Sequence, residues 1–188
     1  ASYGVALALL VMGIAPAFIG EAEPVHEVWA GLLIALSLAL RRREAWFASV
    51  VIASLAALLR ELAAPYLLVM AALAFAENQR KEAAAWLGGL VIFGAALALH
   101  ATTVNGLVTP ADRLSASWVR FGGWPFVLQA SEWALLGPLS PRWLVPVLAP
   151  LALLGFTAWR GALGRRLALT VGGYVVGFLC FGRADNSY

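Results

Sequence analysis

Long apolar segments alternate with short polar clusters along this chain. Apolar residues dominate positions 3–20, 27–40, 83–99, 143–159 and 167–181, and a charged residue or histidine follows each segment within two positions. A membrane-spanning helix needs roughly 20 mainly apolar residues, with a range of about 17–25. The pattern therefore predicts helices that cross a membrane.

The apolar segment at positions 45–76 is too long for one helix that crosses at an ordinary tilt. Arg60-Glu61 interrupts it once, and Pro65 follows. Basic clusters flank it on both sides, Arg41-Arg42-Arg43 before it and Arg80-Lys81 after it, so the positive-inside rule places both ends in the cytoplasm. We expect two short helices that turn near Arg60-Glu61. One long tilted span is the alternative, and it would place Arg80-Lys81 outside.

The distribution of basic residues agrees with one topology. Of the 13 basic residues, eight fall on the predicted cytoplasmic side, four fall outside and Arg60 lies at the turn. The eight are Arg41, Arg42, Arg43, Arg80, Lys81, Arg160, Arg165 and Arg166, and the four are Arg113, Arg120, Arg142 and Arg183. The sequence thus predicts an all-α, polytopic transmembrane helix bundle of about six to seven spans, with residues 1–188 forming a single transmembrane domain.

Residues 101–140 mix turn-forming, polar and aromatic residues, and we expect them to form a long loop outside the cytoplasm. Trp118, Trp124 and Trp133 recur in this region together with Phe121 and Phe126. Aromatic residues mixed with polar groups are typical of helices that lie in the membrane interface. Interfacial helices are therefore expected within the loop.

Composition supports a membrane location. Hydrophobic residues make up 62% of the chain and charged residues 12%, whereas a soluble domain carries about 25% charged residues. We attribute the net charge of +3 to topology signals beside spans and expect no nucleic-acid partner. The single cysteine, Cys180, forms no intrachain disulfide. The chain starts with Ala1 and stops in a polar run, so we expect it to be a segment of a longer protein.

Arg60-Glu61 is the first candidate for chemistry. A charged group at the bilayer centre costs roughly 2.5–3.5 kcal/mol on insertion scales, so two adjacent ones need partners, water or a position near the headgroups. One interpretation is a pair that caps the turn at the outer interface, and another is a snorkelling pair without a role. A third is an anion site, where Arg60 binds a phosphate through its planar fork and Glu61 orients it.

A second cluster, Glu21, Glu23, His26 and Glu27, precedes the segment at 27–40. His26 beside Glu27 suits a metal ion or acid–base catalysis, although the spacing matches no strict metal motif. A hydrophilic loop is the simpler interpretation, and Glu27 also suits the positive end of a helix dipole.

The remaining candidates lie in the predicted outer loop and at the end of the chain. Arg120 and Trp124 could line a sugar site, because aromatic faces stack on carbohydrate, or could anchor the loop in the membrane. Arg183 and Asp185 follow the last apolar segment, where they suit either a site at the membrane surface or a turn. The motifs of soluble enzymes, such as a P-loop, H-E-x-x-H or G-x-S-x-G, are absent from the sequence.

The order of these features resembles the central membrane region of the GT-C superfamily of glycosyltransferases, in particular the bacterial branch near the polyprenol-phosphate-mannose-dependent enzymes. The features follow in this order: a basic loop, a short apolar helix, Arg-Glu at the outer end of that helix, a proline, another short helix and a second basic loop. The residues are Arg41-Arg42-Arg43, Leu58-Leu59-Arg60-Glu61-Leu62-Ala63-Ala64-Pro65-Tyr66 and Arg80-Lys81, preceded by His26-Glu27-Val28-Trp29-Ala30-Gly31-Leu32-Leu33 and followed by Gly182-Arg183-Ala184-Asp185-Asn186-Ser187-Tyr188.

The resemblance implies a polyprenyl-phosphate sugar donor, an acceptor on the outer face of a bacterial inner membrane, and a need for divalent metal that varies among members. A carboxylate base would deprotonate the acceptor hydroxyl, which attacks the sugar carbon while polyprenyl phosphate leaves. Arg60 would hold the phosphate, with Arg120 and Arg183 as alternatives, and Glu27 and His26 would act as catalytic or orienting groups. The family's usual catalytic carboxylate lies upstream of such a hairpin, so we expect it to precede this chain.

Two other functions remain open from the sequence. A transporter or flippase for a lipid or small solute would show inverted repeats or paired broken helices, and one broken pair is present. A non-catalytic membrane subunit would need only bare helices, so the aromatic outer loop argues against a pure scaffold.

Overall fold

The computed structural model describes residues 4, 25–107, 109, 121–135 and 142–181. These residues form seven α-helices and two 3-10 helices, and they contain no strand beyond one isolated bridge between Arg42 and Ala45. The predicted all-α class is therefore confirmed. The first predicted span, at 3–20, falls on residues outside this description.

The chain divides into two compact units. The central unit is Trp29–Ser117, and the terminal unit combines Ala1–Val28 with Trp118–Tyr188. The single transmembrane domain expected from the sequence stays a prediction, and each unit is described by itself.

Three helices of the terminal unit pack against one another. They are α6 (Gly123–Leu135), α7 (Val145–Ala158, preceded by the 3-10 turn Arg142–Leu144) and α8 (Ala162–Cys180). Helix α6 lies within the region 101–140, where we expected a helix at the membrane interface, and that location stays a prediction.

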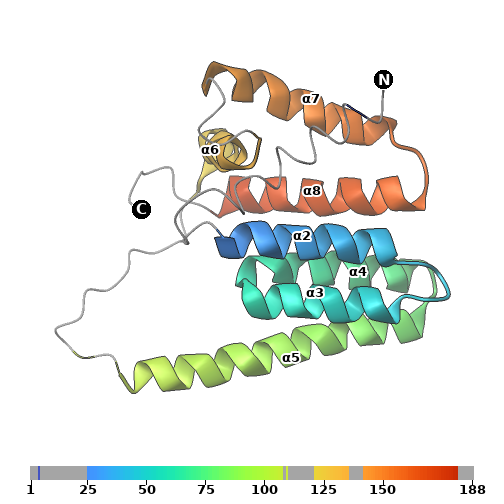
Figure 1. Ribbon diagram of the computed structural model, residues 1–188, viewed down its shortest axis with the longest axis vertical. Coiled ribbons are helices and arrows are strands. Elements are labelled where there is room, and N and C mark those ends of the chain that lie inside the picture. The colour runs from blue at the N-terminus through green and yellow to red at the C-terminus, as the bar shows by residue number, and fades with distance from the viewer. Residues whose placement is uncertain (1–3, 5–24, 108, 110–120, 136–141, 182–188) are drawn as a thin grey trace. The chain divides into compact units, whose positions relative to one another are not determined.

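The central unit is a bundle of helices that alternate in direction and lie side by side (Figure 1). Its elements are α2 (Val25–Leu40, from Trp29 onward), α3 (Phe47–Leu59), η2 (Glu61–Ala63), α4 (Ala64–Ala76) and α5 (Arg80–Asn105). Helix α5 packs along both α3 and α4 and extends past their ends (Figure 1).

The short-helix hairpin expected near Arg60-Glu61 is present. Helix α3 ends at Leu59 because Arg60 adopts an extended conformation, with φ −147° and ψ 119°. A continuous helix is prevented by Pro65, whose ring would clash with the carbonyl of Glu61. Pro65 instead occupies the first turn of α4, where a missing N–H has no cost.

The turn between α4 and α5 closes with a left-handed residue. Asn78 has φ 59°, and the N–H of Gln79 donates to the carbonyl of Ala74 at 2.8 Å. Asparagine tolerates this conformation better than other residues with a side chain, so it ends a helix much as glycine does. The turn brings the start of α5 back beside the end of α4.

The interior of the central unit consists mainly of small residues. Along α3 the buried positions include Ser49, Ala53 and Ala56, and α4 buries Ala71 and Ala74 toward the same interior. Helices meet this closely in membranes, where small side chains allow the backbones to approach.

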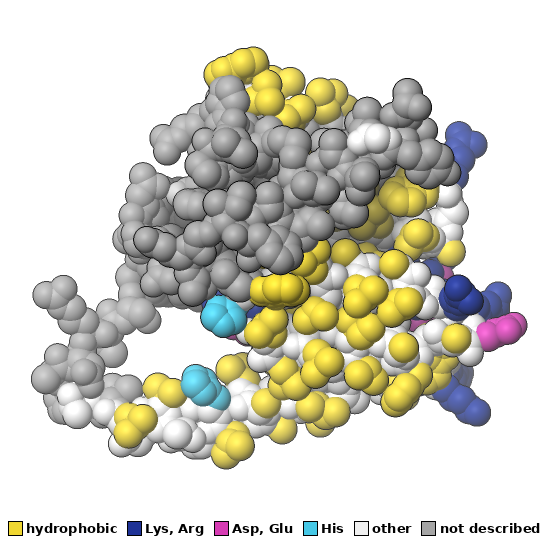
Figure 2. Space-filling model, viewed as in Figure 1, with side chains coloured by type: hydrophobic (Ala, Val, Ile, Leu, Met, Phe, Trp, Pro, Cys, Tyr) yellow, Lys and Arg dark blue, Asp and Glu magenta, His cyan; other side chains and the backbone are white. Residues whose placement is uncertain are grey.

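Many bulky apolar side chains point outward, whereas Tyr66, Leu67, Met70 and Trp86 are buried. The residues exposed on these helices include Phe47, Val51, Leu55, Leu58, Leu68, Phe75, Leu87, Val91 and Ile92. Figure 2 shows hydrophobic side chains spread over the visible face of the central unit, with charged residues gathered at one end. A water-soluble helix shows the opposite arrangement, with its apolar stripe inside and its polar face outside.

Two helix boundaries differ from the sequence prediction. Helix α5 continues to Asn105, so the assignment of residues 101–105 to a loop is wrong. The reason is that Thr102 and Thr103 hydroxyls donate to the carbonyl of Leu99, at 2.8 and 3.0 Å, so their polar side chains are satisfied within the helix. Helix α8 starts at Ala162 rather than at 167, and its first turns include Arg165 and Arg166.

Two of the described helices, α5 with 26 residues and α8 with 19, are long and apolar enough to cross a membrane. The apolar helices α2, α3, α4 and α7 are shorter. At 1.5 Å per residue, α5 is about 39 Å long, and the 13-residue helices α3 and α4 are about 20 Å long each.

Two adjacent glycines of α5 test the close packing. A Cβ on Gly89 would collide with the Ser54 hydroxyl and lie 3.0 Å from Cδ2 of Leu67, whereas one on Gly88 would meet nothing within 4 Å. We expect Gly89→Ala to lower the free energy of unfolding by about 1–3 kcal/mol, the usual cost of overpacking. Gly88→Ala should leave it unchanged or raise it.

The measurement is the unfolding transition of each variant in detergent micelles. Because Ser54 supplies the nearest atom, Ser54→Ala combined with Gly89→Ala should recover part of the loss. Equal transitions for Gly88→Ala and Gly89→Ala would contradict this packing.

Candidate functional site

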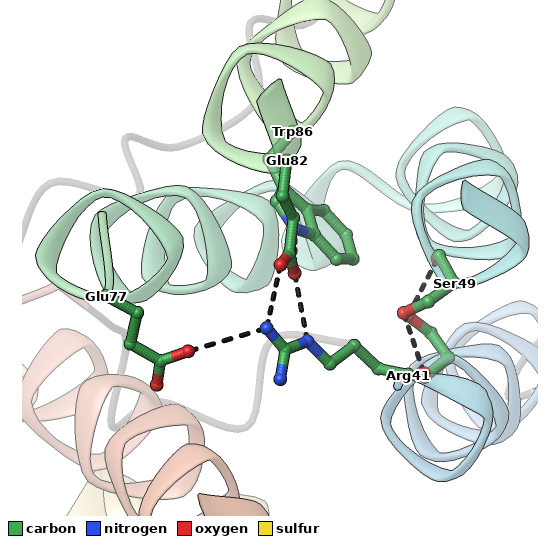
Figure 3. A network of polar contacts seen from close by, with 6 residues as sticks. Arg41, Ser49, Glu77, Glu82 and Trp86 are labelled. Carbon is green, nitrogen blue, oxygen red and sulfur yellow. Dashed lines mark hydrogen bonds and ion pairs between the residues drawn. The ribbon is translucent and has the colours of Figure 1, made fainter. Parts of the chain in front are cut away.

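A buried ion pair joins the end of α2 to the start of α5. The Arg41 guanidinium donates to both carboxylate oxygens of Glu82, from Nε to Oε1 at 3.0 Å and from Nη2 to Oε2 at 2.7 Å. Nη2 also lies 3.4 Å from Oε2 of Glu77, at the end of α4. Figure 3 shows the guanidinium between the two carboxylates, with its planar fork facing Glu82.

Burial makes this contact stronger than a surface ion pair. The Arg41 side chain is 8% exposed and that of Glu82 is 0% exposed. Burial by itself lowers the pKa of the Arg41 guanidinium, but the hydrogen bond and charge of Glu82, followed by Glu77, outweigh it and raise that pKa above its ordinary value. The folded protein binds this proton more tightly than the unfolded chain does, so the ionised arginine stabilises the fold at every pH below the raised pKa. Arg41 therefore stays charged across the physiological range.

A tryptophan completes the environment of Glu82. Nε1 of Trp86 donates to Oε1 of Glu82 at 3.2 Å, one helical turn along α5. The Trp86 ring is buried and meets the ring of Tyr66 edge-on, with centroids 5.9 Å apart. The carboxylate is thus bonded to an arginine and an indole, which leaves it committed to the protein rather than open to a substrate.

Serine side chains link α2, α3 and α4 one turn deeper. The Ser37 hydroxyl donates to the carbonyl of Ser49 at 2.8 Å, and the Ser49 hydroxyl donates to the carbonyl of Ser37 at 2.7 Å. The Tyr66 hydroxyl lies 2.9 Å from Oγ of Ser37. The two serine hydroxyls also lie 2.9 Å from each other, so Ser37, Ser49 and Tyr66 form one hydrogen-bonded cluster. These buried polar groups hold three helices in one register.

The residues singled out in the sequence around the hairpin turn lie at the other end of α3. Arg60 is half-buried, Glu61 is exposed, and Nη1 of Arg60 lies 3.7 Å from Oε1 of Glu61. Both residues lie outside the regular helices, since Arg60 is extended and Glu61 opens the 3-10 turn. A guanidinium on an irregular, accessible turn is chemically able to bind an anion.

The other predicted site residues that the structure describes lie on α2 and α6. His26 and Glu27 are exposed in the first turn of α2, and Trp124 lies in α6 of the terminal unit, 39% exposed. Arg120, Arg183 and Asp185 lie outside the described residues. Over the described ranges, no group of three or more His, Cys, Asp or Glu side chains is placed to hold a metal ion.

The terminal unit contains an open hollow at the turn between α7 and α8. Phe156, Trp159, Arg160 and Arg165 contribute to its lining. The turn is tight, because Gly161 has φ 114° and a Cβ on Gly164 would collide with the backbone of Trp159.

Comparisons of the chain with protein-family models, with curated proteins and with solved structures find no match.

Sequence reasoning missed the ion pair between Arg41 and Glu82. Arg41 was interpreted as a topology signal, and Glu82 had no role. The available signal was the placement of Glu82 four residues before Trp86 at the start of an apolar helix, where an indole N–H needs an acceptor.

The ion pair can be tested with matched arginine variants. Arg41→Leu leaves Glu82 buried without its charge partner, which typically costs about 3–5 kcal/mol. Arg42→Leu, in the same turn but exposed, should change the free energy of unfolding by no more than about 0.5 kcal/mol.

The measurement is reversible unfolding in mixed micelles, with Glu82→Leu and the double variant Arg41→Leu/Glu82→Leu completing a cycle. We expect the double variant to lose less than the two single variants combined. Strict additivity would show that the pair contributes no coupling.

Proposed function

We propose that the chain is a multi-pass membrane protein whose cationic end faces the cytoplasm. The observation that carries this proposal is the outward position of its bulky apolar side chains. Phe47 and Phe75 are each 68% exposed, and Val91 is 71% exposed, while the interior holds serines and an ion pair. Lipid solvates such a surface at no cost, whereas water would not.

Charge and length support the orientation. Arg41-Arg42-Arg43 and Arg80-Lys81 lie at the same end of the central unit, where α2 and α4 end and α3 and α5 begin. Helix α5, at about 39 Å, exceeds the roughly 30 Å hydrocarbon core. The hairpin of α3 and α4, at about 20 Å, is about 10 Å shorter than that core, so the Arg60 side chain would have to extend outward to reach the outer headgroups.

For the activity we propose a glycosyltransferase that uses a polyprenyl-phosphate sugar donor. The support is the resemblance to the GT-C superfamily together with the accessible Arg60 at the break between α3 and α4. A phosphate held by an isoprenoid lipid has its charge at the headgroup depth, and a guanidinium fork binds phosphate bidentately.

In the proposed reaction a carboxylate removes the proton of an acceptor hydroxyl, and the oxygen forms a bond to the sugar carbon. The bond from that carbon to the phosphate oxygen breaks, and polyprenyl phosphate leaves with its added negative charge beside Arg60. Glu61, 3.7 Å from Arg60, would orient the guanidinium. Glu27 in the first turn of α2 is the candidate carboxylate within this chain.

The orientation predicts opposite labelling of the two ends of the central unit. In a Cys180→Ser background, which removes the only cysteine, single cysteines are placed at Arg43 and at Thr103. In inverted vesicles a membrane-impermeant maleimide should label position 43 and spare position 103. The reverse pattern would overturn the topology, and equal labelling in sealed vesicles would contradict a crossing α5.

The activity predicts a specific need for the guanidinium of Arg60. Transfer of radiolabelled sugar from polyprenyl-phosphate donors should fall by about 10²–10³-fold in Arg60→Ala, the usual effect of removing a donor to a developing charge. Arg60→Lys keeps the charge but not the fork, so its loss should be smaller. Arg42→Ala, at the opposite end, is the matched control and should transfer at the normal rate.

Folding of each variant is checked by its elution and unfolding transition. Normal transfer by a folded Arg60→Ala protein would remove Arg60 from the site. No transfer by the unmodified protein from any polyprenyl-phosphate donor would contradict the proposed activity.

A further inference from the structure

Four basic side chains stand exposed at one end of the central unit. They are Arg42 and Arg43 in the turn before α3, and Arg80 and Lys81 in the first turn of α5. None of the four side chains makes an ion pair or hydrogen bond with the residues that the structure describes. We refer to these four residues as the cationic face; the dark blue side chains at the end of the central unit in Figure 2 mark its position.

The buried ion pair keeps this face from being neutralised. Glu77 and Glu82 are the carboxylates nearest in sequence to Arg80 and Lys81, but both are directed at Arg41. Glu82 is fully buried and accepts a further hydrogen bond from Trp86. Glu44 is exposed and Glu77 is 23% exposed, but the four exposed cations outnumber these two carboxylates, so the accessible charge of this end is positive.

Exposed aromatic side chains border the cationic face. Phe47 follows Arg43 by four residues, Phe75 precedes Arg80 by five, and each is 68% exposed. Trp46 is half-buried beside Phe47, with ring centroids 6.4 Å apart. Along these helices the cations are followed within about one turn by aromatic side chains and then by aliphatic ones. A lipid presents its groups in a matching order, from phosphate through glycerol to acyl chain.

We propose that the cationic face binds anionic phospholipids of the cytoplasmic leaflet. Their phosphates contact Arg42, Arg43, Arg80 and Lys81, and their acyl chains lie along Phe47 and Phe75. Charge complementarity selects an anionic headgroup, since basic side chains near an anionic membrane surface are attracted to it. The apolar border favours a lipid over an acidic peptide, which would leave Phe47 and Phe75 uncovered.

This inference rests on the proposed membrane location and is independent of glycosyl transfer. The protein is reconstituted in bilayers of phosphatidylcholine that contain a trace of spin-labelled phosphatidylglycerol or spin-labelled phosphatidylcholine. Lipid in contact with protein gives a motionally restricted component in the electron paramagnetic resonance spectrum. The ratio of the restricted fractions of the two labels measures selectivity for the anionic headgroup.

Two variants change the charge at this end of the central unit and a third keeps it, and all three leave Arg41 and its partners in place. Arg42→Gln/Arg43→Gln should move the selectivity ratio toward one. Arg42→Lys/Arg43→Lys should keep most of the selectivity, because the charges remain. Glu44→Gln removes the exposed carboxylate of the same turn and should raise the ratio above that of the unmodified protein.

The possible results separate the two proposals. Selectivity that follows the charge of this face in both directions supports phospholipid binding there. Equal restriction of both labels by the unmodified protein overturns the inference while leaving the membrane location intact, and so does selectivity that survives Arg42→Gln/Arg43→Gln. If neither label is restricted, the protein is not embedded, and both proposals fail.

Discussion

The contact between Arg41 and Glu82 is the constraint on which the central unit depends. Two charges with exposed fractions of 8% and 0% persist away from water only if each is matched in geometry and charge. Arg41 directly follows α2, and Glu82 lies in the first turn of α5. The pair therefore fixes the position of each helix along its axis relative to the other. Glu77 accepts a further hydrogen bond from Nη2 of Arg41, and Trp86 donates one to Glu82, so the cluster joins α2, the end of α4 and α5.

Contacts deeper in the interior fix the same alignment of the helices. Ser37 and Ser49 exchange hydrogen bonds between α2 and α3, Tyr66 joins them from α4, and Gly89 lets α5 approach Ser54 and Leu67. Small residues and hydrogen bonds thus replace the interlocking of large apolar side chains that holds a soluble core. Of the large side chains, Tyr66, Leu67, Met70 and Trp86 fill the interior, and many others lie on the outer surface, which suits contact with lipid. Arg42 and Arg43 lie next to this ion pair and stay exposed.

The parts of this fold that follow from local sequence were predictable. Arg60-Glu61 and Pro65 inside an apolar run dictate a break, and the hairpin of α3 and α4 appears there. Helix ends were less predictable. The Thr102 and Thr103 hydroxyls donate hydrogen bonds to the carbonyl of Leu99 within α5, and composition does not reveal these bonds. The pairing of Arg41 with Glu82 could not be predicted, since it joins residues 41 positions apart and depends on how α2 and α5 pack. Of the candidate site, the local pair Arg60 and Glu61 was predictable, whereas distant candidates such as Trp124 required the tertiary structure.

The central claim is that lipid, not water, surrounds the apolar surface of the central unit. Spin labels at Leu55 and Leu68, which point outward, and at Ala53 and Ala74, which point inward, test it in bilayers of a Cys180→Ser protein. The account predicts that Leu55 and Leu68 labels collide often with oxygen and rarely with a water-soluble nickel chelate, and that Ala53 and Ala74 labels collide rarely with either. Frequent collisions of the Leu55 and Leu68 labels with the nickel chelate would contradict it.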